Sequence, residues 1–213
     1  MKLYSYWRST AAYRVRIALN IKQLKHKIKP IHLVKDGGEQ LKDNYKSINP
    51  QSLVPALAID DGEVLTQSLA IIDYLEEKFP QTSLYPKNFM QKYQAKAMAL
   101  SIACDIHPLN NLRVLKYLKS EEWQQKQVDK WYAHWIHQGF SAIEIQLEKS
   151  AGQFCFGNNA SIADIFLVAQ VYNANRFNVP LDDYPLIVKI NDHCLTQNAF
   201  IDAMPENQVD CDL

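Results

Sequence analysis

Near its start the chain reads Tyr6-Trp7-Arg8-Ser9-Thr10-Ala11-Ala12-Tyr13-Arg14-Val15-Arg16-Ile17-Ala18-Leu19. The preceding residues, 2–6, form a short strand pattern, so the hydroxyls of Ser9 and Thr10 stand where a helix begins. The first N–H groups of a helix lack partners inside it, and with the helix dipole they attract anions such as a thiolate or a carboxylate. Two interpretations stay open. Either Ser9 or Thr10 only caps the helix, or the hydroxyls and Arg8 form an anion site.

The same segment holds three of the five arginines among the 23 cationic residues. A planar guanidinium is hard to replace in a buried pair or in carboxylate recognition. The cluster therefore favours a structural or binding role, although a lysine-rich genome composition would also make arginine rare elsewhere.

The residues up to position 80 mix strands and helices. The first helix separates two strands, which are parallel if the helix crosses over between them, and Pro80 stops the last helix. In order, the pattern predicts a helix over 13–24, a strand over 28–34, a turn at 35–39, strands over 56–60 and 63–65 joined by Asp61-Gly62, and a helix over 67–79.

Two positions in this region are compatible with ligand binding. Pro55 interrupts an apolar run, which indicates a strand edge, a bulge or a cis bond. A cis bond would turn the backbone of Val54 outward toward a peptide-like ligand. Gln67-Ser68 begins the next helix, where a hydroxyl beside unpaired N–H groups is either an ordinary cap or a second anion site.

Beyond the linker at 81–87 only helical patterns remain. They cover about 89–119, 121–149, 161–174 and 185–196, and Pro108 interrupts the first. Ser161 and Asp164 are spaced as in a capping box, which we interpret as a folding signal. The order βαβ, strand proline, ββα and then helices predicts a thioredoxin-like α/β domain over 1–80 and an all-α domain over 88–213.

Composition excludes several classes of function. The net charge is zero and the pI is near 7, so nothing favours nucleic acid or an anionic membrane as a partner. No apolar run reaches membrane-spanning length and no signal-peptide core is present, and the four scattered cysteines are expected to be free thiols in the cytoplasm. His134 and His137 lie three residues apart but have no third ligand nearby, so no metal site is expected.

The chain resembles the zeta class of the glutathione transferase superfamily, the class that includes maleylacetoacetate isomerase. The resemblance covers essentially all 213 residues and is most specific in the segment 6–19, which is similar to the zeta motif Ser-Ser-Cys-Ser-x-Arg-Val-Arg-Ile-Ala-Leu. Supporting matches are Lys35-Asp36-Gly37-Gly38, Asn49-Pro50, Val54-Pro55, Gln67-Ser68-Leu69-Ala70-Ile71-Ile72, Ile106-His107-Pro108-Leu109-Asn110-Asn111, Ser161-Ile162-Ala163-Asp164 and Asn175-Arg176-Phe177.

The resemblance implies a glutathione-dependent cis–trans isomerisation of maleylacetoacetate to fumarylacetoacetate in tyrosine and phenylalanine breakdown. It implies glutathione as cofactor, a small dicarboxylic keto acid as substrate and a homodimer. By position, Ser9 and Thr10 correspond to the thiolate-stabilising residues, and Arg8 and Arg176 to the pair that receives the substrate carboxylates. The other glutathione contacts that it implies are Gln40, Val54, Pro55, Gln67, Ser68, His107, Asn111 and Arg113.

One departure from the zeta motif changes the expected chemistry. Its cysteine falls at Ala11 and its next serine at Ala12, so no cysteine stands at the helix N-terminus. This removes a cysteine nucleophile of the omega type and leaves Ser9 and Thr10 to stabilise a thiolate.

Three alternatives to the maleylacetoacetate reaction remain from the sequence. A maleylpyruvate isomerase would use the same chemistry on a shorter keto acid. A general transferase would conjugate glutathione to electrophiles or remove halogen from small haloacids. A non-catalytic binding module of the same fold would need neither thiol nor γ-glutamyl contacts, and the set Ser9, Pro55, Gln67 and Ser68 argues against it.

Overall fold

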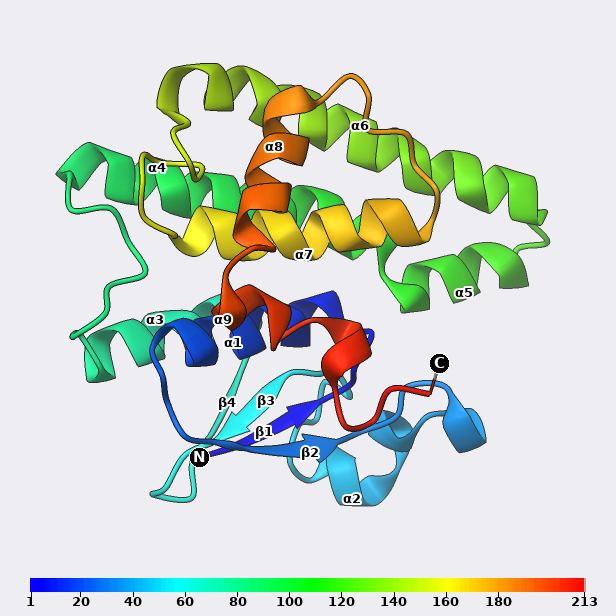
Figure 1. Cartoon of the computed structure of the whole chain (residues 1–213). Coiled ribbons are helices and arrows are strands. Elements are labelled where there is room, and N and C mark those ends of the chain that lie inside the picture. Colours follow the sequence, from blue (N-terminus) through cyan, green and yellow to red (C-terminus); the bar gives the residue numbers. More distant parts are fainter. Residues whose placement is uncertain (213) are drawn as a thin grey trace. The chain divides into compact units, whose positions relative to one another are not determined.

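The computed structural model describes residues 1–212 and contains two compact units. The first unit spans Met1–Ser83 together with the chain from Gln197 onward, and the second spans Leu84–Thr196. Figure 1 shows the elements of each unit, coloured along the sequence.

The first unit is a four-stranded mixed sheet with helices on both faces (Figure 1). The strand order is β2-β1-β3-β4, with β1 parallel to β2 and the other pairs antiparallel, as in a thioredoxin-like domain. Its elements are β1 (Lys2–Ser5), α1 (Thr10–Ile21), β2 (Lys27–Pro30), α2 (Asp43–Lys46), β3 (Ala56–Ala58), β4 (Val64–Thr66), α3 (Ser68–Lys78) and α9 (Asn198–Ile201), with the 3-10 turns η1 (Lys35–Gly37), η2 (Glu39–Leu41) and η5 (Pro205–Asn207).

The predicted βαβ order is confirmed, and the first helix begins at the Ser9 and Thr10 hydroxyls rather than at residue 13, where the predicted range starts. Helix α1 starts at Thr10, because Ser9 caps it: the Ser9 Oγ accepts a hydrogen bond from the Ala12 N–H at 3.2 Å. Apolar side chains of α1 and β1, among them Ile17 and Leu3, are fully buried between helix and sheet. Burial of this face stabilises the unit around the turn that joins β1 to α1.

Other boundaries in the first unit also differ from the prediction. Strand β2 ends at Pro30 rather than at residue 34, and the predicted turn at 35–39 is two short 3-10 turns. Gln67 precedes helix α3 with a φ of 67° instead of beginning it. Helices α2 and α9 were not predicted, because four residues are too few to show a helical period.

The second unit is all-helical within the described residues. Pro108 interrupts the first predicted helix, as expected, because it lacks an N–H group. A π-helical stretch precedes that interruption and a 3-10 turn contains it. The elements are α4 (Phe89–Leu100), η3 (Ser101–Ile106), η4 (His107–Asn110), α5 (Leu112–Ser120), α6 (Gln125–Ser150), α7 (Ile162–Arg176) and α8 (Pro185–Cys194).

Helix α7 forms the centre of this unit. Most of its side chains are buried, and the predicted capping box is present at its start. The Asp164 carboxylate accepts hydrogen bonds from the Ser161 N–H and Oγ, both at 2.8 Å, and from the Cys155 N–H at 2.7 Å. The cap therefore also fixes the loop that leads into the helix.

The last part of the chain leaves the helical unit. We name residues 197–212 the return segment, because their contacts lie with the first unit rather than with residues 84–196. The Arg16 Nε donates to the Ala203 carbonyl at 2.9 Å, and the Asn20 side chain donates to the Ala199 carbonyl at 3.1 Å. The sequence placed 88–213 in one helical domain; these long-range hydrogen bonds leave no trace in local periodicity.

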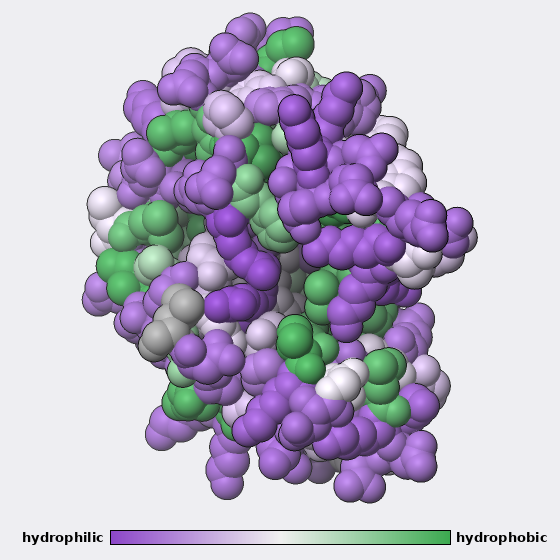
Figure 2. Space-filling view, turned by 90° about the vertical axis from the view of Figure 1, so that its right-hand side faces the viewer, coloured by the Kyte–Doolittle hydropathy of each residue, from purple (hydrophilic) through white to green (hydrophobic). Residues whose placement is uncertain are grey.

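The face drawn in Figure 2 is mostly hydrophilic, with hydrophobic residues in small scattered groups. No helix in the described part of the chain is both long and apolar enough to cross a membrane. All four cysteines are free thiols; Cys104 is exposed, and Cys155 and Cys194 are buried.

Candidate active site

The turn between β1 and α1 presents a hydroxyl that has capacity for a ligand. Ser9 is partly exposed, and its oxygen accepts from the Ala12 N–H while its own O–H proton has no acceptor within the described chain. A serine hydroxyl can accept and donate at once, so capping and thiolate stabilisation are compatible. Thr10 is buried at 3% exposure. Of the two hydroxyls, Ser9 is thus the one open to a ligand.

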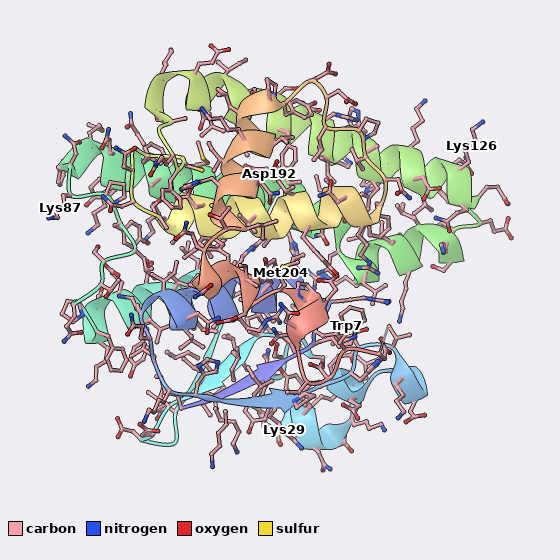
Figure 3. All side chains as sticks on the ribbon, in the orientation of Figure 1. Trp7, Lys29, Lys87, Lys126, Asp192 and Met204 are labelled. Atoms are coloured by element: carbon pink, nitrogen blue, oxygen red, sulfur yellow. The ribbon has the colours of Figure 1, made fainter. Side chains whose placement is uncertain are left out.

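Arg8 lies beside Ser9 and is held by its neighbour. Its guanidinium lies 4.1 Å from the ring centroid of Trp7, which is fully buried. A cation over an aromatic face is attracted by the ring quadrupole. Figure 3 shows Trp7 beyond the end of β1. Because Trp7 is fully buried and its N–H donates to Asp210, the residue that precedes Arg8 is held in place.

Gln40 lies on the η2 turn with its amide folded under Gly38. It is buried, its Nε2 donates to the Leu33 carbonyl at 3.4 Å, and its Oε1 has no partner in the described chain. A Cβ at Gly38 would stand 2.6 Å from this Nε2 and 2.7 Å from this Oε1, and Gly38 has a φ of 104°. Gly38 is therefore required both by its backbone and by the amide of Gln40.

The loop before β3 carries Val54 and Pro55, and the peptide bond between them is cis. No hydrogen bond within the described residues uses the N–H or C=O of Val54. The loop is held by Tyr45 and Asn49, which both donate to the Leu53 carbonyl at 2.7 Å. Burial raises the pKa of Tyr45 to about 12, so its hydroxyl remains a donor at neutral pH.

Gln67 and Ser68 stand at the start of α3. Ser68 is buried, and its hydroxyl lies 3.5 Å from an Arg14 guanidinium nitrogen. Gln67 is exposed, donates to the Gln51 side chain at 3.2 Å and makes no capping hydrogen bond. The positive charge of Arg14 and the start of α3 together make this position suitable for a carboxylate.

In the second unit, three predicted residues lie within the short stretch 107–113, at and after the interruption at Pro108. His107 lies in η4, and Asn111 caps α5 by accepting from the Arg113 N–H at 3.1 Å. The Arg113 side chain is exposed. The structure thus gives Asn111 a capping role that the sequence did not anticipate, and it shares the short stretch 107–113 with the other two.

Arg176, at the end of α7, is supported by two stacked rings. Its guanidinium lies 5.1 Å from the ring centroid of Phe177, and Phe177 stacks on Tyr132 at 3.8 Å. Tyr132 is almost fully buried, and this burial raises the pKa of its hydroxyl. The exposed Arg176 therefore extends from a rigid aromatic base, as Arg8 does in the first unit.

Within the first unit, the turn that carries Ser9 and the loop that carries Val54 pack on the same apolar cluster. Val54 belongs to an apolar cluster with Tyr6, Trp7, Ile31 and Tyr45. The backbone carrying Ser9 and the loop carrying Val54 are therefore supported by the same packed side chains. Residues 107–113 and Arg176 belong to the second unit.

The donors and acceptors of the first unit suit a peptide with a thiol and a carboxylate. The backbone of Val54 can pair with a peptide, and the Ser9 O–H can donate to a thiolate. Glutathione, the cofactor expected from the sequence, has these groups. The residues present therefore fit it.

Sequence reasoning gave no role to several residues that hold the site. Arg16 donates to the Tyr6 and Trp7 carbonyls, and Asp210 accepts from the Trp7 N–H at 3.0 Å. The arginine cluster was a signal for Arg16. No local pattern marks Asp210, because its partner lies 203 positions away.

Among the described residues, no group of three or more histidines, cysteines and acids is arranged so that it could hold a metal ion. The His137 Nδ1 lies 2.9 Å from the Tyr184 hydroxyl, which gives this histidine a packing role.

Comparison with known proteins adds a family. Residues 3–83 match the family described as Glutathione S-transferase, N-terminal domain. The chain is 49% identical to a probable maleylacetoacetate isomerase of Vibrio cholerae, over 98% of this chain and 97% of that protein.

Solved structures are similar over their whole length. The holo structure of a maleylpyruvate isomerase, described as a bacterial glutathione S-transferase of the zeta class, has a TM-score of 0.94 and 42% identity, covering 99% of both chains. A maleylacetoacetate isomerase of Methylobacterium extorquens with bound malonate and glutathione has a TM-score of 0.92 and 36% identity, covering 98% of both chains.

Proposed function

Because the chain belongs to the zeta class of the glutathione transferase family, we propose that it is a glutathione-dependent cis–trans isomerase that converts maleylacetoacetate to fumarylacetoacetate. This reaction is a step in tyrosine and phenylalanine breakdown. The observation that carries the proposal is the Ser9 hydroxyl, which caps α1 through its oxygen and keeps its proton for a ligand beside Arg8.

Rotation about a carbon–carbon double bond requires the double-bond character to be removed for a moment. Glutathione, when bound, supplies a thiolate that adds to the alkene and later leaves it. The task of Ser9 is to donate a hydrogen bond to the thiolate sulfur, which favours the ionised thiol over a free thiol of pKa about 8.5. The N-terminus of α1 favours the same negative charge.

Arg8 and Arg176 serve the substrate. Negative charge develops on the substrate carbonyl oxygen while the carbon–carbon bond is single, and a guanidinium stabilises it by charge-assisted hydrogen bonds. The substrate is also a dianion, so it needs cationic partners for its carboxylates. Both arginines are supported by aromatic rings, at 4.1 Å for Arg8 and 5.1 Å for Arg176, which reduces the freedom that each must lose on binding.

Glutathione itself is held by the remaining residues of the first unit. Val54 pairs with the peptide backbone, with Pro55 fixing the loop, and Gln67 with Ser68 receives the γ-glutamyl end. Gln40 contributes from the η2 turn. His107, Asn111 and Arg113 contribute from the second unit.

Maleylpyruvate is the second candidate substrate. The similarity to a maleylpyruvate isomerase structure, with a TM-score of 0.94, favours it. Both substrates need the same bond rotation and differ in the tail that the pocket accommodates.

The ratio of kcat/KM for the two substrates tests this choice. We expect maleylacetoacetate, or its analogue maleylacetone, to have the higher value. A higher kcat/KM for maleylpyruvate would reassign the physiological substrate.

A homodimer and a cytoplasmic location complete the proposal. Phe89, Met90 and Tyr93 are 72%, 60% and 51% exposed on one helix, α4, and such apolar residues are typical of an interface. Analytical ultracentrifugation of the protein, with Tyr93→Glu as the disrupted variant, tests the dimer; a monomeric wild type would contradict it. The exposed free thiol of Cys104 suits a reducing compartment, and cell fractionation tests the location.

A further inference from the structure

The return segment ends against two parts of the candidate site. Figure 1 shows it passing α1 and approaching the loop after β2. Its last described residues, Asp210, Cys211 and Asp212, each contact a different feature there. None of these three residues is assigned a role in the reaction proposed above.

Asp210 holds the turn that carries Arg8 and Ser9. Its Oδ2 accepts from the Trp7 N–H at 3.0 Å. From the other side, the Arg16 guanidinium donates to the Trp7 carbonyl at 3.1 Å and to the Ala203 carbonyl at 2.9 Å. Trp7 thus has both its backbone groups bound, one by the return segment and one by an arginine that also binds the return segment.

The position of the Asp210 carboxylate lowers the stability of the folded chain. Its second oxygen, Oδ1, is buried and has no hydrogen-bond partner in the described chain. A buried acceptor without a partner loses its hydration without compensation. The hydrogen bond from the Trp7 N–H therefore explains the buried position of the Asp210 carboxylate better than a gain in stability does.

Asp212 holds the second part through His32. Its Oδ2 lies 3.3 Å from the His32 Nε2. The His32 Nδ1 accepts from the N–H groups of Val34 and Lys35, at 3.2 and 2.8 Å, so the ring proton is on Nε2 and is donated to Asp212. His32 thereby ties the return segment to the start of the loop that leads to Gln40.

The same loop is closed by further contacts of His32. Its backbone N–H donates to the Glu39 carboxylate at 2.7 Å, and its carbonyl accepts from the Glu39 N–H at 2.8 Å. Gln40 follows directly. The position of the Gln40 amide therefore depends on a loop that is anchored at His32.

Cys211 lies between the two acids and packs against the apolar cluster that contains Trp7 and Val54. Three successive residues of the return segment thus contact the Ser9 turn, the base of the Val54 loop and the Gln40 loop.

We propose that Asp210 and Asp212 are positioning residues of the glutathione site, Asp210 for the Ser9 turn and Asp212, through His32, for the Gln40 loop. This inference rests on the glutathione site proposed above. It predicts that the two acids affect glutathione differently. Loss of Asp210 affects both the binding of glutathione and the ionisation of its thiol, whereas loss of Asp212 affects binding alone.

The test compares Asp210→Ala, Asp210→Asn and Asp212→Ala with the wild type. Asp202→Asn is the matched control, because Asp202 is an exposed acid of the return segment whose side chain makes no hydrogen bond or ion pair in the described chain. The readouts are KM for glutathione, KM for maleylacetone, the pH at which the bound thiol ionises, measured by thiolate absorbance, and amide hydrogen exchange.

We expect Asp210→Ala to raise KM for glutathione about tenfold, the equivalent of one charge-assisted hydrogen bond, and to shift ionisation of the bound thiol to higher pH. Asp210→Asn retains an oxygen that accepts from the Trp7 N–H and should restore most of both. Asp212→Ala should raise KM for glutathione about two- to threefold, as expected for a partly exposed pair, with the thiol ionisation unchanged. KM for maleylacetone should rise in Asp210→Ala, because the turn that Asp210 holds also carries Arg8, and should stay at the wild-type value in Asp212→Ala. The control should keep wild-type values throughout.

Hydrogen exchange provides a readout that does not need glutathione. Residues 1–12 should exchange faster in Asp210→Ala, and residues 31–42 in Asp212→Ala, while α7 stays unchanged. Wild-type exchange in both segments, or wild-type KM for glutathione in both alanine variants, would overturn the positioning role. The positioning role would also be overturned if Asp210→Ala changed all kinetic constants by the same factor and Asp210→Asn did not restore them. A wild type that binds no glutathione would instead overturn the proposed function, which is a different measurement.

Discussion

At the scale of single residues, the geometry of Ser9 is compatible with both roles that the sequence left as alternatives, helix capping and anion binding. Its oxygen caps α1 and its proton remains available, so the capping interpretation and the anion-site interpretation are both compatible with one geometry. Thr10, the other candidate, is buried. Exposure, which the sequence does not show, separates the two hydroxyls.

Replacing Ser9 by Ala should lower kcat/KM about 10- to 100-fold, since a hydrogen bond to a charged group contributes about 1.5–3 kcal/mol. The pH at which the bound thiol ionises should rise. Ser9→Asp keeps a capping oxygen but repels a thiolate, so it separates capping from chemistry and should be at least as inactive. Thr10→Val, which removes only the other hydroxyl, should retain activity; a loss at Thr10 with none at Ser9 would reverse the assignment.

Gly38 offers a second residue-scale test with a control next to it. Gly38→Ala should weaken glutathione binding, because its Cβ would stand 2.6 Å from the Gln40 amide nitrogen. Gly37→Ala has the same kind of backbone cost, with a φ of 82°, but its Cβ meets open space. Both should lose about 1 kcal/mol of stability, and only Gly38→Ala should raise KM for glutathione in steady-state assays. Equal KM values would remove Gln40 from the site.

At the scale of elements, the end of α7 presents Arg176 on stacked rings. Arg176→Ala should raise KM for the dicarboxylic substrate and leave KM for glutathione unchanged, because the role proposed for this arginine concerns only the substrate carboxylate. Phe177→Leu keeps the charge but removes its aromatic support, so its effect should be in the same direction and smaller. The exposed Lys130 on α6 is the charge control: Lys130→Ala should change neither constant. An unchanged substrate KM in Arg176→Ala would remove this residue from the carboxylate site.

The start of α7 gives a stability prediction with a defined pH dependence. Burial raises the pKa of the Asp164 carboxyl above its ordinary value, while hydrogen bonds from Cys155 and Ser161 oppose that rise. A group whose pKa is higher in the folded state contributes most below its unfolded value, and this contribution is lost as pH rises through the raised pKa.

Asp164→Asn keeps one acceptor oxygen for the Cys155 N–H but replaces the other, which accepts from the Ser161 N–H and Oγ, with an NH2 group. It should therefore cost about 2 kcal/mol in acid, where two donors lose their acceptor, and the difference from wild type should narrow as pH rises. Urea unfolding at a series of pH values measures this difference. Asp183→Asn, an exposed acid in the same unit, should show no such trend. A gap that widens with pH would show that the ionised carboxylate is the stabilising form.

Several elements followed from sequence because their signals are local. The order of strands and helices, the interruption at Pro108 and the capping box at Ser161 and Asp164 all depend on residues within a few positions. Helix ends were less accurate: α1 begins three residues before the predicted position, because a single cap at Ser9 outweighs the apolar period.

The support of the site could not be predicted, because it is made by residues far apart in the chain. Asp210 binds Trp7, Asp212 binds His32, and Phe177 stacks on Tyr132. The predicted ligand-binding residues themselves came from resemblance, and the structure adds what holds them. The roles of these residues in binding glutathione and substrate stay predictions.

At the scale of the whole molecule, the chain contains two units, and each carries part of the proposed set of functional residues. The first unit offers the Ser9 hydroxyl and the unpaired backbone of Val54, which suit a thiol peptide. The second offers Arg176 on an aromatic base. The return segment belongs to the first unit by its contacts, although it follows the second unit in the sequence.

The central claim is that this chain isomerises a cis dicarboxylic keto acid only with glutathione. Proton NMR of maleylacetone and maleylpyruvate, recorded with the protein in the presence and absence of glutathione, tests it most directly. We expect the cis alkene signal of at least maleylacetone to convert to the trans signal with both present, and no enzymatic conversion without glutathione. Absence of glutathione-dependent conversion of either compound would contradict the account.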